Sequence, residues 1–300
     1  MISKHCFINI GGLMITLQNE NLIMQIHPLG AEPQSLIVKE TGIEYLWDGN
    51  KEYWFRHAPL LFPMTGPTKE NKIAVNGNEY TMPNNGFARD TEFTLVNKTS
   101  NQATFMLEEN EASLKNYPYR FSLLVTYTLL EDGYQAKAEI FAKEDLYFTF
   151  GWHPAFSLNI NGEDTPLEAY HIEFDECETA DRKYPIEGVF ATEKHFLDNT
   201  KVLKLSRKET DKGPIVLNGL KSKTVSLVCD TGDHGVKVER GNLDTLVFWT
   251  CAPKQAQYLC IEPMHSFGDT TRPLELKDMK EVLFLEQGLS KTFNSTFFVF

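Results

Sequence analysis

The order of hydrophobic and polar residues predicts strands along most of the chain. Apolar and polar positions alternate over short runs, and the dipeptides Asn76-Gly77 and Asp132-Gly133 each separate two such runs. Both dipeptides are typical of tight turns, so each pair of runs is expected to form an antiparallel hairpin. In chain order, the expected strands are Leu13–Leu17, Leu22–His27, Lys72–Asn76, Glu79–Met82, Phe121–Leu130, Tyr134–Ala142, Tyr147–Phe150, Val225–Cys229, Val236–Glu239, Thr245–Thr250, Tyr258–Ile261, Val282–Leu285 and Lys291–Phe300.

Helical patterns are few. Glu111–Asn116 and Leu276–Lys280 are expected to form short helices at the periphery. Many strands without alternating helices favour an all-β protein, in which antiparallel sheets pack face to face or close into a barrel. We expect one domain over residues 14–300, preceded by an N-terminal extension at residues 1–13.

Composition narrows the range of partners. The 300 residues are 42% hydrophobic and 23% charged, and the net charge is −12 at pH 7. An acidic chain has no long-range attraction to nucleic acid or to an anionic membrane, so neither is expected as a partner. No run approaches the roughly 18 apolar residues of a membrane-spanning helix, and residues 1–14 lack the apolar segment of a signal peptide. We therefore expect a cytoplasmic protein that is a monomer or a weak homodimer.

The cysteines argue against a disulfide framework or a zinc site. Their number is odd, and they show neither Cys-x-x-Cys spacing nor a cluster with histidines along the chain. Reduced and mostly buried thiols, without a bound metal, are the expectation. The five are Cys6, Cys177, Cys229, Cys251 and Cys260.

Two irregular segments carry arginines that could bind a ligand. Trp54–Pro67 contains Arg56 among three prolines, and Met82–Phe93 contains Arg89 just after the turn-like Asn85-Gly86. A guanidinium group presents several N–H donors in a fixed geometry, which suits vicinal hydroxyls or a phosphate. Each arginine taken alone is more often part of a structural ion pair.

His153 and Glu262 form the best candidate for chemistry. Pro154 restricts His153 to extended backbone near the end of a strand. Apolar neighbours surround Glu262 at the end of another expected strand, and desolvation there raises the pKa of a carboxyl group and makes it a better base. If the two side chains meet, they can donate a proton to one oxygen and take a proton from another.

Taken together and in order, these segments resemble the aldose 1-epimerase (galactose mutarotase) family, and within it the bacterial LacX-like subgroup. The resemblance extends from about residue 14 to the end of the chain. The residues that carry it are Arg56 with Pro59 and Leu61-Phe62-Pro63, then Gly86-Phe87-Ala88-Arg89-Asp90, then Trp152-His153-Pro154, then Cys260-Ile261-Glu262-Pro263.

The resemblance implies a large antiparallel β-sandwich of the galactose mutarotase type, with a few short helices and a sugar groove across one sheet. It implies that His153 is the general acid, that Glu262 is the general base and that Arg56 contacts the substrate. The implied reaction interconverts the α and β anomers of a free hexose, such as galactose or glucose, without a metal or an organic cofactor.

Further sugar contacts are expected from Asn85 and Arg89. Trp152 is expected to stack on the apolar face of the sugar, with Trp54 or Phe87 as alternatives. Asn85 departs from the family pattern, which usually has a histidine directly before Gly-Phe-Ala-Arg. An asparagine can donate and accept hydrogen bonds, but it cannot titrate near neutral pH.

Two alternatives stay open. The first is a hexose 6-phosphate 1-epimerase, in which Arg56, Arg89 and Lys69 hold the phosphate. The second is a non-catalytic carbohydrate-binding protein with the same fold, which the substitution at Asn85 favours.

Overall fold

The computed structural model describes residues 13–162, 165–186, 189–267, 274–279 and 281–300. Of the expected N-terminal extension, residues 1–12 lie outside the described residues. Most of the strand residues belong to one sheet of 15 strands, and every pairing within it is antiparallel. In spatial order its strands are β4 (Leu60–Leu61), β12 (Gly151–Trp152), β20 (Tyr258–Met264), β19 (Thr245–Trp249), β16 (Ile215–Asn218), β14 (Tyr170–Ile186), β17 (Thr224–Cys229), β18 (Val236–Glu239), β22 (Ser290–Val299), β10 (Gly133–Ala142), β9 (Phe121–Leu129), β8 (Gln102–Glu108) and β7 (Thr94–Lys98), with β13 (Ala155–Ser157) beside β20 and β15 (Val189–Lys204) beside β14.

Three smaller sheets complete the fold. The largest is formed by β1 (Ile15–Gln18), β2 (Leu22–His27) and β3 (Glu32–Val38). The others are two-stranded: β5 (Lys72–Val75) with β6 (Asn78–Thr81), and β11 (Leu146–Phe148) with β21 (Leu283–Leu285). The helices are α1 (Glu111–Leu114) and α2 (Arg207–Thr210), with short 3-10 turns at η1 (Lys69–Asn71), η2 (Ala88–Asp90), η3 (Asn159–Asn161), η4 (Leu167–Ala169) and η5 (Leu276–Asp278).

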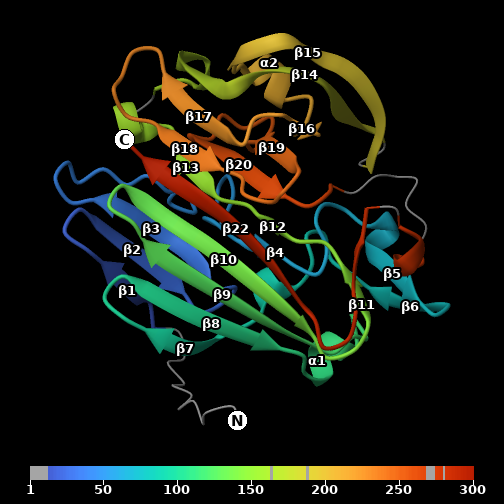
Figure 1. The fold of residues 1–300 in the computed structure, drawn as a ribbon. Helices are drawn as coiled ribbons and strands as arrows, with labels where there is room; N and C mark the ends of the chain where they lie inside the picture. The colour runs from blue at the N-terminus through green and yellow to red at the C-terminus, as the bar shows by residue number, and fades with distance from the viewer. Residues whose placement is uncertain (1–12, 163–164, 187–188, 268–273, 280) are drawn as a thin grey trace.

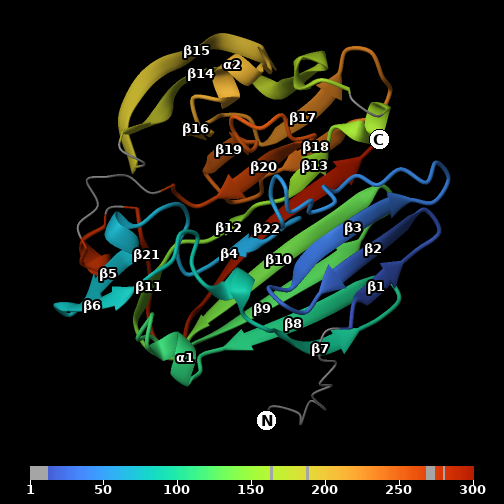
Figure 2. The same ribbon diagram turned by 180° about the vertical axis from the view of Figure 1, so that it is seen from behind.

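The core lies between two layers of strands. Alternate residues of β2 (Leu22, Met24 and Ile26) and of β9 (Leu123 and Val125) are buried in one apolar cluster. This is the pattern that period-two alternation produces when one face of each strand is covered. Figure 2 shows β1, β2 and β3 lying across the face of β8, β9 and β10. This packing of antiparallel sheets confirms the expected β-sandwich fold.

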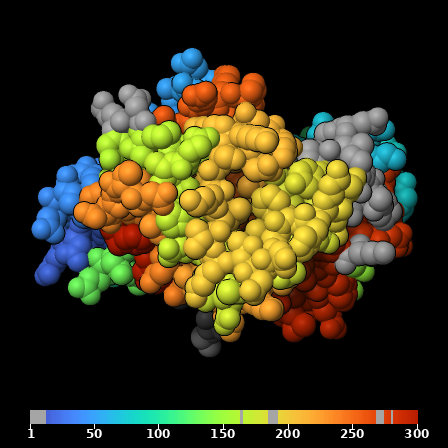
Figure 3. Space-filling view, turned by 90° about the horizontal axis from the view of Figure 1, so that it is seen from above, coloured from blue at the N-terminus to red at the C-terminus, as the bar shows by residue number. Residues whose placement is uncertain are grey.

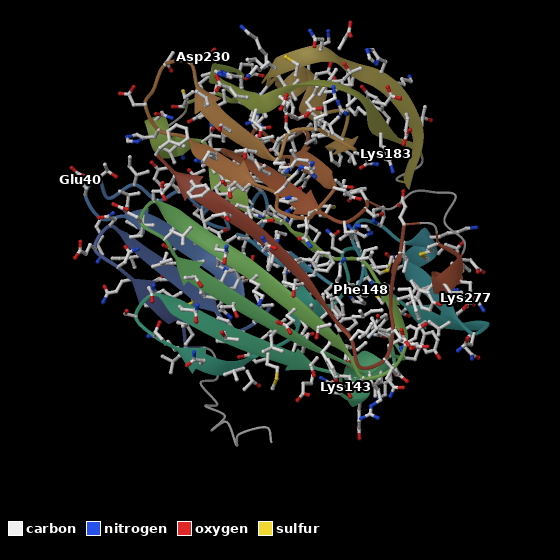
Figure 4. All side chains as sticks on the ribbon, in the orientation of Figure 1. Glu40, Lys143, Phe148, Lys183, Asp230 and Lys277 are labelled. Atoms are coloured by element: carbon white, nitrogen blue, oxygen red, sulfur yellow. The ribbon has the colours of Figure 1, made fainter. Side chains whose placement is uncertain are left out.

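The long strand β22 joins the two halves of the large sheet. It pairs with β10 on one side and with β18 on the other, and Figure 1 shows it running between the two groups of strands. Phe148 lies among the interior side chains in Figure 4, whereas Glu40, Asp230 and Lys277 lie at the periphery. The half that contains β16, β19 and β20 carries the candidate site.

Each of the expected strands is present, with ends that shift by a few residues. The pattern missed the long hairpin β14–β15, which covers much of the upper face of the molecule in Figure 3. It also missed β3, β7, β8 and β16 and the short strands β4, β12 and β13. Expected helix Glu111–Asn116 is confirmed as α1 in its first four residues. The segment Leu276–Lys280 forms only the single 3-10 turn η5, and Lys280 lies outside the described residues.

Candidate active site

Strand pairing places His153 directly opposite Glu262. Strands β12 and β13 lie on either side of the His153-Pro154 dipeptide, and both pair with β20. Their pairings share one register, with Gly151 opposite Met264 and Ala155 opposite Cys260. Continuing that register between the two strands brings His153 across from Glu262. Opposite residues of an antiparallel pair have Cβ atoms about 4.5–5.5 Å apart on the same face of the sheet.

Glu262 lies within a strand rather than at its end. The expected strand ended at Ile261, but β20 continues through Pro263 to Met264. It continues because β19 pairs with it on one side and β12 and β13 pair with it on the other. The carboxyl group is therefore enclosed by strands on both sides, and the residue is only 2% exposed.

The two side chains are in contact and buried. His153 Nε2 lies 3.4 Å from Glu262 Oε2. The other polar atom of each side chain, Nδ1 of His153 and Oε1 of Glu262, is buried without a hydrogen-bond partner among the described residues. A hydroxyl group of a bound ligand, which can both donate and accept, would supply the kind of partner that these atoms lack.

Burial moves the pKa values of the pair in opposite directions. Desolvation lowers the pKa of His153 to about 3, with further lowering by the positive charges of Arg89 and Arg56. Desolvation raises the pKa of Glu262 well above 4.5, although Arg89 opposes that rise. Both shifts favour the neutral form of each group, since a low-dielectric environment penalises charge.

Arg56 and Arg89 line the cavity above this pair. The Arg56 guanidinium is held by Asp90, with Nη2 2.5 Å from Oδ1, and by the carbonyl oxygen of Arg89 at 3.2 Å. Arg89 donates to the carbonyl oxygen of Asn84 at 2.6 Å, and burial lowers its pKa to about 10. It therefore stays protonated at neutral pH.

Strand β3 anchors the loop that carries Arg56. Glu32 is buried, and its Oε1 accepts hydrogen bonds from the backbone N–H groups of His57 at 2.7 Å and Ala58 at 3.0 Å. These contacts fix the backbone immediately after Arg56, so the loop holds its guanidinium group in a defined position.

Tryptophans form the walls of the cavity. Trp54 stacks on the His153 ring with centroids 4.9 Å apart, and Trp249 meets the same ring edge-on at 5.7 Å. The cavity has a volume of about 390 Å³, which is within the range of small-molecule sites. Its lining residues are Trp54, Phe55, Arg56, Asn84, Asn85, Arg89, His153, Pro214, Val247, Trp249, Glu262 and Phe267.

Asn85 lines the cavity and also shapes the loop beneath it. Its φ of 65° lies in the left-handed region, which asparagine tolerates better than most residues. Its Oδ1 accepts the Gly66 N–H at 2.7 Å, and its own N–H donates to the Gly66 carbonyl at 3.1 Å. Gly86 follows at φ 71°, where a Cβ atom would lie 2.2 Å from the Phe62 carbonyl oxygen.

The structure brings together five of the six residues expected at the site. His153, Glu262, Arg56, Asn85 and Arg89 all line the cavity.

Trp152 lies elsewhere. It is buried beside Tyr127 and Phe150 on the opposite face of the strand, so it is not placed to stack on a ligand. Phe87 packs against Tyr117 and Phe121 in the core, and of the three proposed stacking residues only Trp54 reaches the cavity.

Sequence reasoning missed Trp249 and its neighbour Val247. Both belong to an expected strand, and β19 pairs with β20 so that Val247 lies opposite Glu262 and Trp249 opposite Cys260. Only knowledge of that pairing assigns them to the face of the sheet that carries the acid–base pair.

Comparison with known proteins identifies the family of the chain. A sequence model of the aldose 1-epimerase family matches residues 13–274. The chain belongs to the aldose 1-epimerase family. Among its relatives is the plasmid-encoded protein LacX of Lactococcus lactis subsp. lactis, which is 31% identical over 263 residues covering 84% of this chain and 87% of LacX.

Solved structures of proteins described as related or similar to galactose mutarotase share the fold. A galactose mutarotase related enzyme from Lactobacillus acidophilus superposes with a TM-score of 0.91 at 25% identity, over 96% of this chain and 97% of that one. A galactose mutarotase-like protein from Lactobacillus casei gives a TM-score of 0.88 at 26% identity, over 96% and 100%. The resemblance to the family and to its LacX-like subgroup is thus confirmed. Among the described residues of this aldose 1-epimerase family member, no helix has the length and apolar character needed to cross a bilayer.

Proposed function

We propose that the protein is an aldose 1-epimerase that interconverts the anomers of a free hexose, with His153 and Glu262 as its proton-transferring groups. The contact of 3.4 Å between His153 Nε2 and Glu262 Oε2, at the floor of a cavity lined by arginine and tryptophan, carries the proposal. The two sugar oxygens that exchange protons are bonded to the same carbon, C1. An acid and a base that serve both must therefore lie close to each other.

In the proposed reaction, the Glu262 carboxylate takes the proton from the hydroxyl on C1, and the His153 imidazolium gives a proton to the ring oxygen. The bond between C1 and the ring oxygen breaks as the C1 carbonyl forms. Rotation about the C1–C2 bond exposes the other face of the aldehyde. Ring closure then reverses both proton transfers. Positioned acid–base groups typically contribute about 10²–10⁴-fold in rate.

The surroundings of the pair favour the protonation state that it reaches when the ring is open. Ring opening converts an imidazolium and a carboxylate into a neutral imidazole and a neutral carboxylic acid. Burial favours these neutral forms, as the lowered pKa of His153 and the raised pKa of Glu262 indicate. The pair holds one proton between its members throughout, so no proton has to leave the cavity during a turnover.

The walls of the cavity suit a polyhydroxylated ring. Arg56 and Arg89 supply N–H donors for hydroxyl oxygens, and Trp54 supplies an apolar face for the C–H side of the ring. Of the three cations considered for a phosphate, Lys69 lies in η1 outside the cavity lining, and Arg56 is already paired with Asp90. The same contacts support a free hexose over a hexose 6-phosphate.

Polarimetry of freshly dissolved α-D-glucose and α-D-galactose tests the proposal. The wild-type protein is expected to accelerate the approach to the equilibrium rotation, and His153→Ala and Glu262→Ala to lower that acceleration by at least 10²-fold. His171→Ala and Glu173→Ala, whose side chains contact each other on β14 outside the cavity lining, are matched controls expected to keep the wild-type rate. Sugar binding by calorimetry without any acceleration would instead support the carbohydrate-binding alternative.

A further inference from the structure

A third side chain with a metal-binding atom lies beside the acid–base pair. Cys260 is two residues before Glu262 in β20 and opposite Ala155 of β13, so its side chain points to the same face as His153 and Glu262. One ligand atom from each of the three residues lies within 4.8 Å of the others. Cys260 is fully buried and forms no disulfide.

We propose that His153, Cys260 and Glu262 form a binding site for Zn²⁺ and similar thiophilic divalent cations, and that occupation of this site blocks the active site. A thiolate, an imidazole nitrogen and a carboxylate oxygen are the three ligand types that zinc takes in proteins. Three protein ligands leave a fourth position for water, which faces the cavity. The inhibitory part rests on the proposed function, whereas the binding part does not.

The geometry requires only a small contraction. Zinc bonds of about 2.0–2.3 Å in a tetrahedral site place the ligand atoms about 3.5 Å apart, so a separation of at most 4.8 Å closes by at most about 1.3 Å. His153 contributes a lone pair from one ring nitrogen and Glu262 a carboxylate oxygen. Cys260 binds as the thiolate, and its proton leaves to solvent as the sulfur–metal bond forms. Neither oxidation nor reduction takes place.

The unpartnered atoms of the pair support a ligand at this position. Nδ1 of His153 and Oε1 of Glu262 are buried without partners among the described residues. Each can turn toward a cation, or toward the water that completes its coordination, without giving up a hydrogen bond to the protein.

The charges around the site predict which cations bind. Arg89 and Arg56 line the same cavity and repel any cation. Mg²⁺ and Ca²⁺ depend on several oxygen ligands, and this site offers one carboxylate, so neither is expected to bind. Zn²⁺, Co²⁺ and Cd²⁺ are expected to bind, because each gains a thiolate bond and an imidazole bond.

Cobalt absorbance tests the binding directly. Addition of Co²⁺ to the metal-free wild-type protein is expected to produce a thiolate-to-cobalt charge-transfer band in the near ultraviolet at one equivalent. Cys260→Ala and the more conservative Cys260→Ser are expected to lose the band. Cys251→Ala is the matched control, because Cys251 packs in the same apolar cluster as Cys260 but is outside the three-ligand group. Absence of the band in wild type, or its loss in Cys251→Ala instead, would overturn the proposal.

Inhibition by zinc tests the consequence. Each variant is compared with its own rate in EDTA, so a change in basal activity does not affect the comparison. The concentration of Zn²⁺ that halves mutarotation is expected to rise at least tenfold in Cys260→Ser and to stay unchanged in Cys251→Ala, with Mg²⁺ inert. Equal zinc sensitivity of wild type and Cys260→Ser would contradict the site. A cobalt band that depends on Cys260 in a protein without mutarotase activity would refute the proposed function and leave the metal site standing.

Discussion

At the scale of single residues, the carboxyl group of Glu262 is buried and poorly solvated. Its Oε2 contacts His153, and its Oε1 has no hydrogen-bond partner among the described residues. Burial raises the pKa of this carboxyl group above that of the unfolded chain. A raised folded-state pKa adds stability at acidic pH, and this contribution is lost as the pH rises from the unfolded pKa through the folded one.

Glu262→Gln is therefore expected to abolish mutarotation and to stabilise the fold. The amide keeps the shape of the side chain but cannot ionise. The free energy of unfolding of the variant should exceed that of the wild type by a margin that grows from pH 5 to pH 8 and reaches about 1–3 kcal/mol. Thermal denaturation at both pH values measures it.

Glu178 is the matched control for that substitution. It is also buried, but its carboxylate accepts the backbone N–H groups of Lys221 at 3.2 Å and Ser222 at 2.6 Å. Glu178→Gln should destabilise the protein, because the strength of those bonds depends on the charge. Destabilisation of Glu262→Gln at pH 8 would show that its carboxylate is well solvated or paired.

Short motifs allowed most of the site residues to be predicted, and strand geometry explains the exception. His153 and Trp152 are adjacent in an extended segment, so their side chains point to opposite faces. If His153 faces the cavity, Trp152 cannot, and the sequence alone held enough information to exclude it. Trp249 is different, because its place in the site depends on its position opposite Cys260 in another strand.

At the scale of elements, the close approach of β12 and β20 sets the position of His153. A Cβ atom on Gly151 would lie 2.5 Å from the Cβ atom of Met264. Both atoms belong to paired strands, so a methyl group at this position has to push β12 away from β20. The displacement would reach His153 two residues later.

Gly151→Ala should consequently lower kcat about 10–100-fold while the protein remains folded, because small shifts of catalytic groups cost rate steeply. Gly133→Ala is a matched control in β10, where a Cβ atom would lie 2.1 Å from the Phe297 carbonyl oxygen, far along the sheet from the cavity. It should lower the melting temperature and leave kcat of the folded protein unchanged. Equal kcat losses in both variants would mean that general destabilisation, rather than the position of His153, is the cause.

Two further elements could not be predicted in full from the alternation of apolar and polar residues. The hairpin β14–β15 escaped prediction because its pairing shifts register at several points and charged residues interrupt its alternation. Strand β20 continues beyond Ile261, where the expected strand ended, and passes through Pro263, because strands on both sides pair with it.

At the scale of the whole molecule, the order of the strands in the sheet could not be predicted from the sequence. Strand β22 pairs with β10 and β18, and β12 pairs with β4 and β20, so neighbours in space are often far apart along the chain. Alternation and turn residues identify a strand and its outward face, but they carry no information on a distant partner. The all-β class was therefore predictable from the residues, whereas the sandwich followed from the family resemblance.

The charge of the whole molecule bears on the choice of substrate. The chain carries a net charge of −12, and the cavity contributes two arginines, of which Arg56 is already paired with Asp90. A phosphate dianion would be repelled by the overall field before it reached this cavity, whereas a neutral hexose would not.

Free glucose and galactose should therefore show kcat/KM values that change less than about twofold between low and high salt, and their 6-phosphates should be poorer substrates. Salt screens the repulsion, so any activity on the 6-phosphates should rise with ionic strength. Polarimetry of free hexoses, and coupled assays for the phosphates, at two salt concentrations decide the matter. A 6-phosphate preferred at low salt would show that Arg56 and Arg89 bind phosphate in spite of the overall charge, and would move the assignment to a hexose 6-phosphate 1-epimerase.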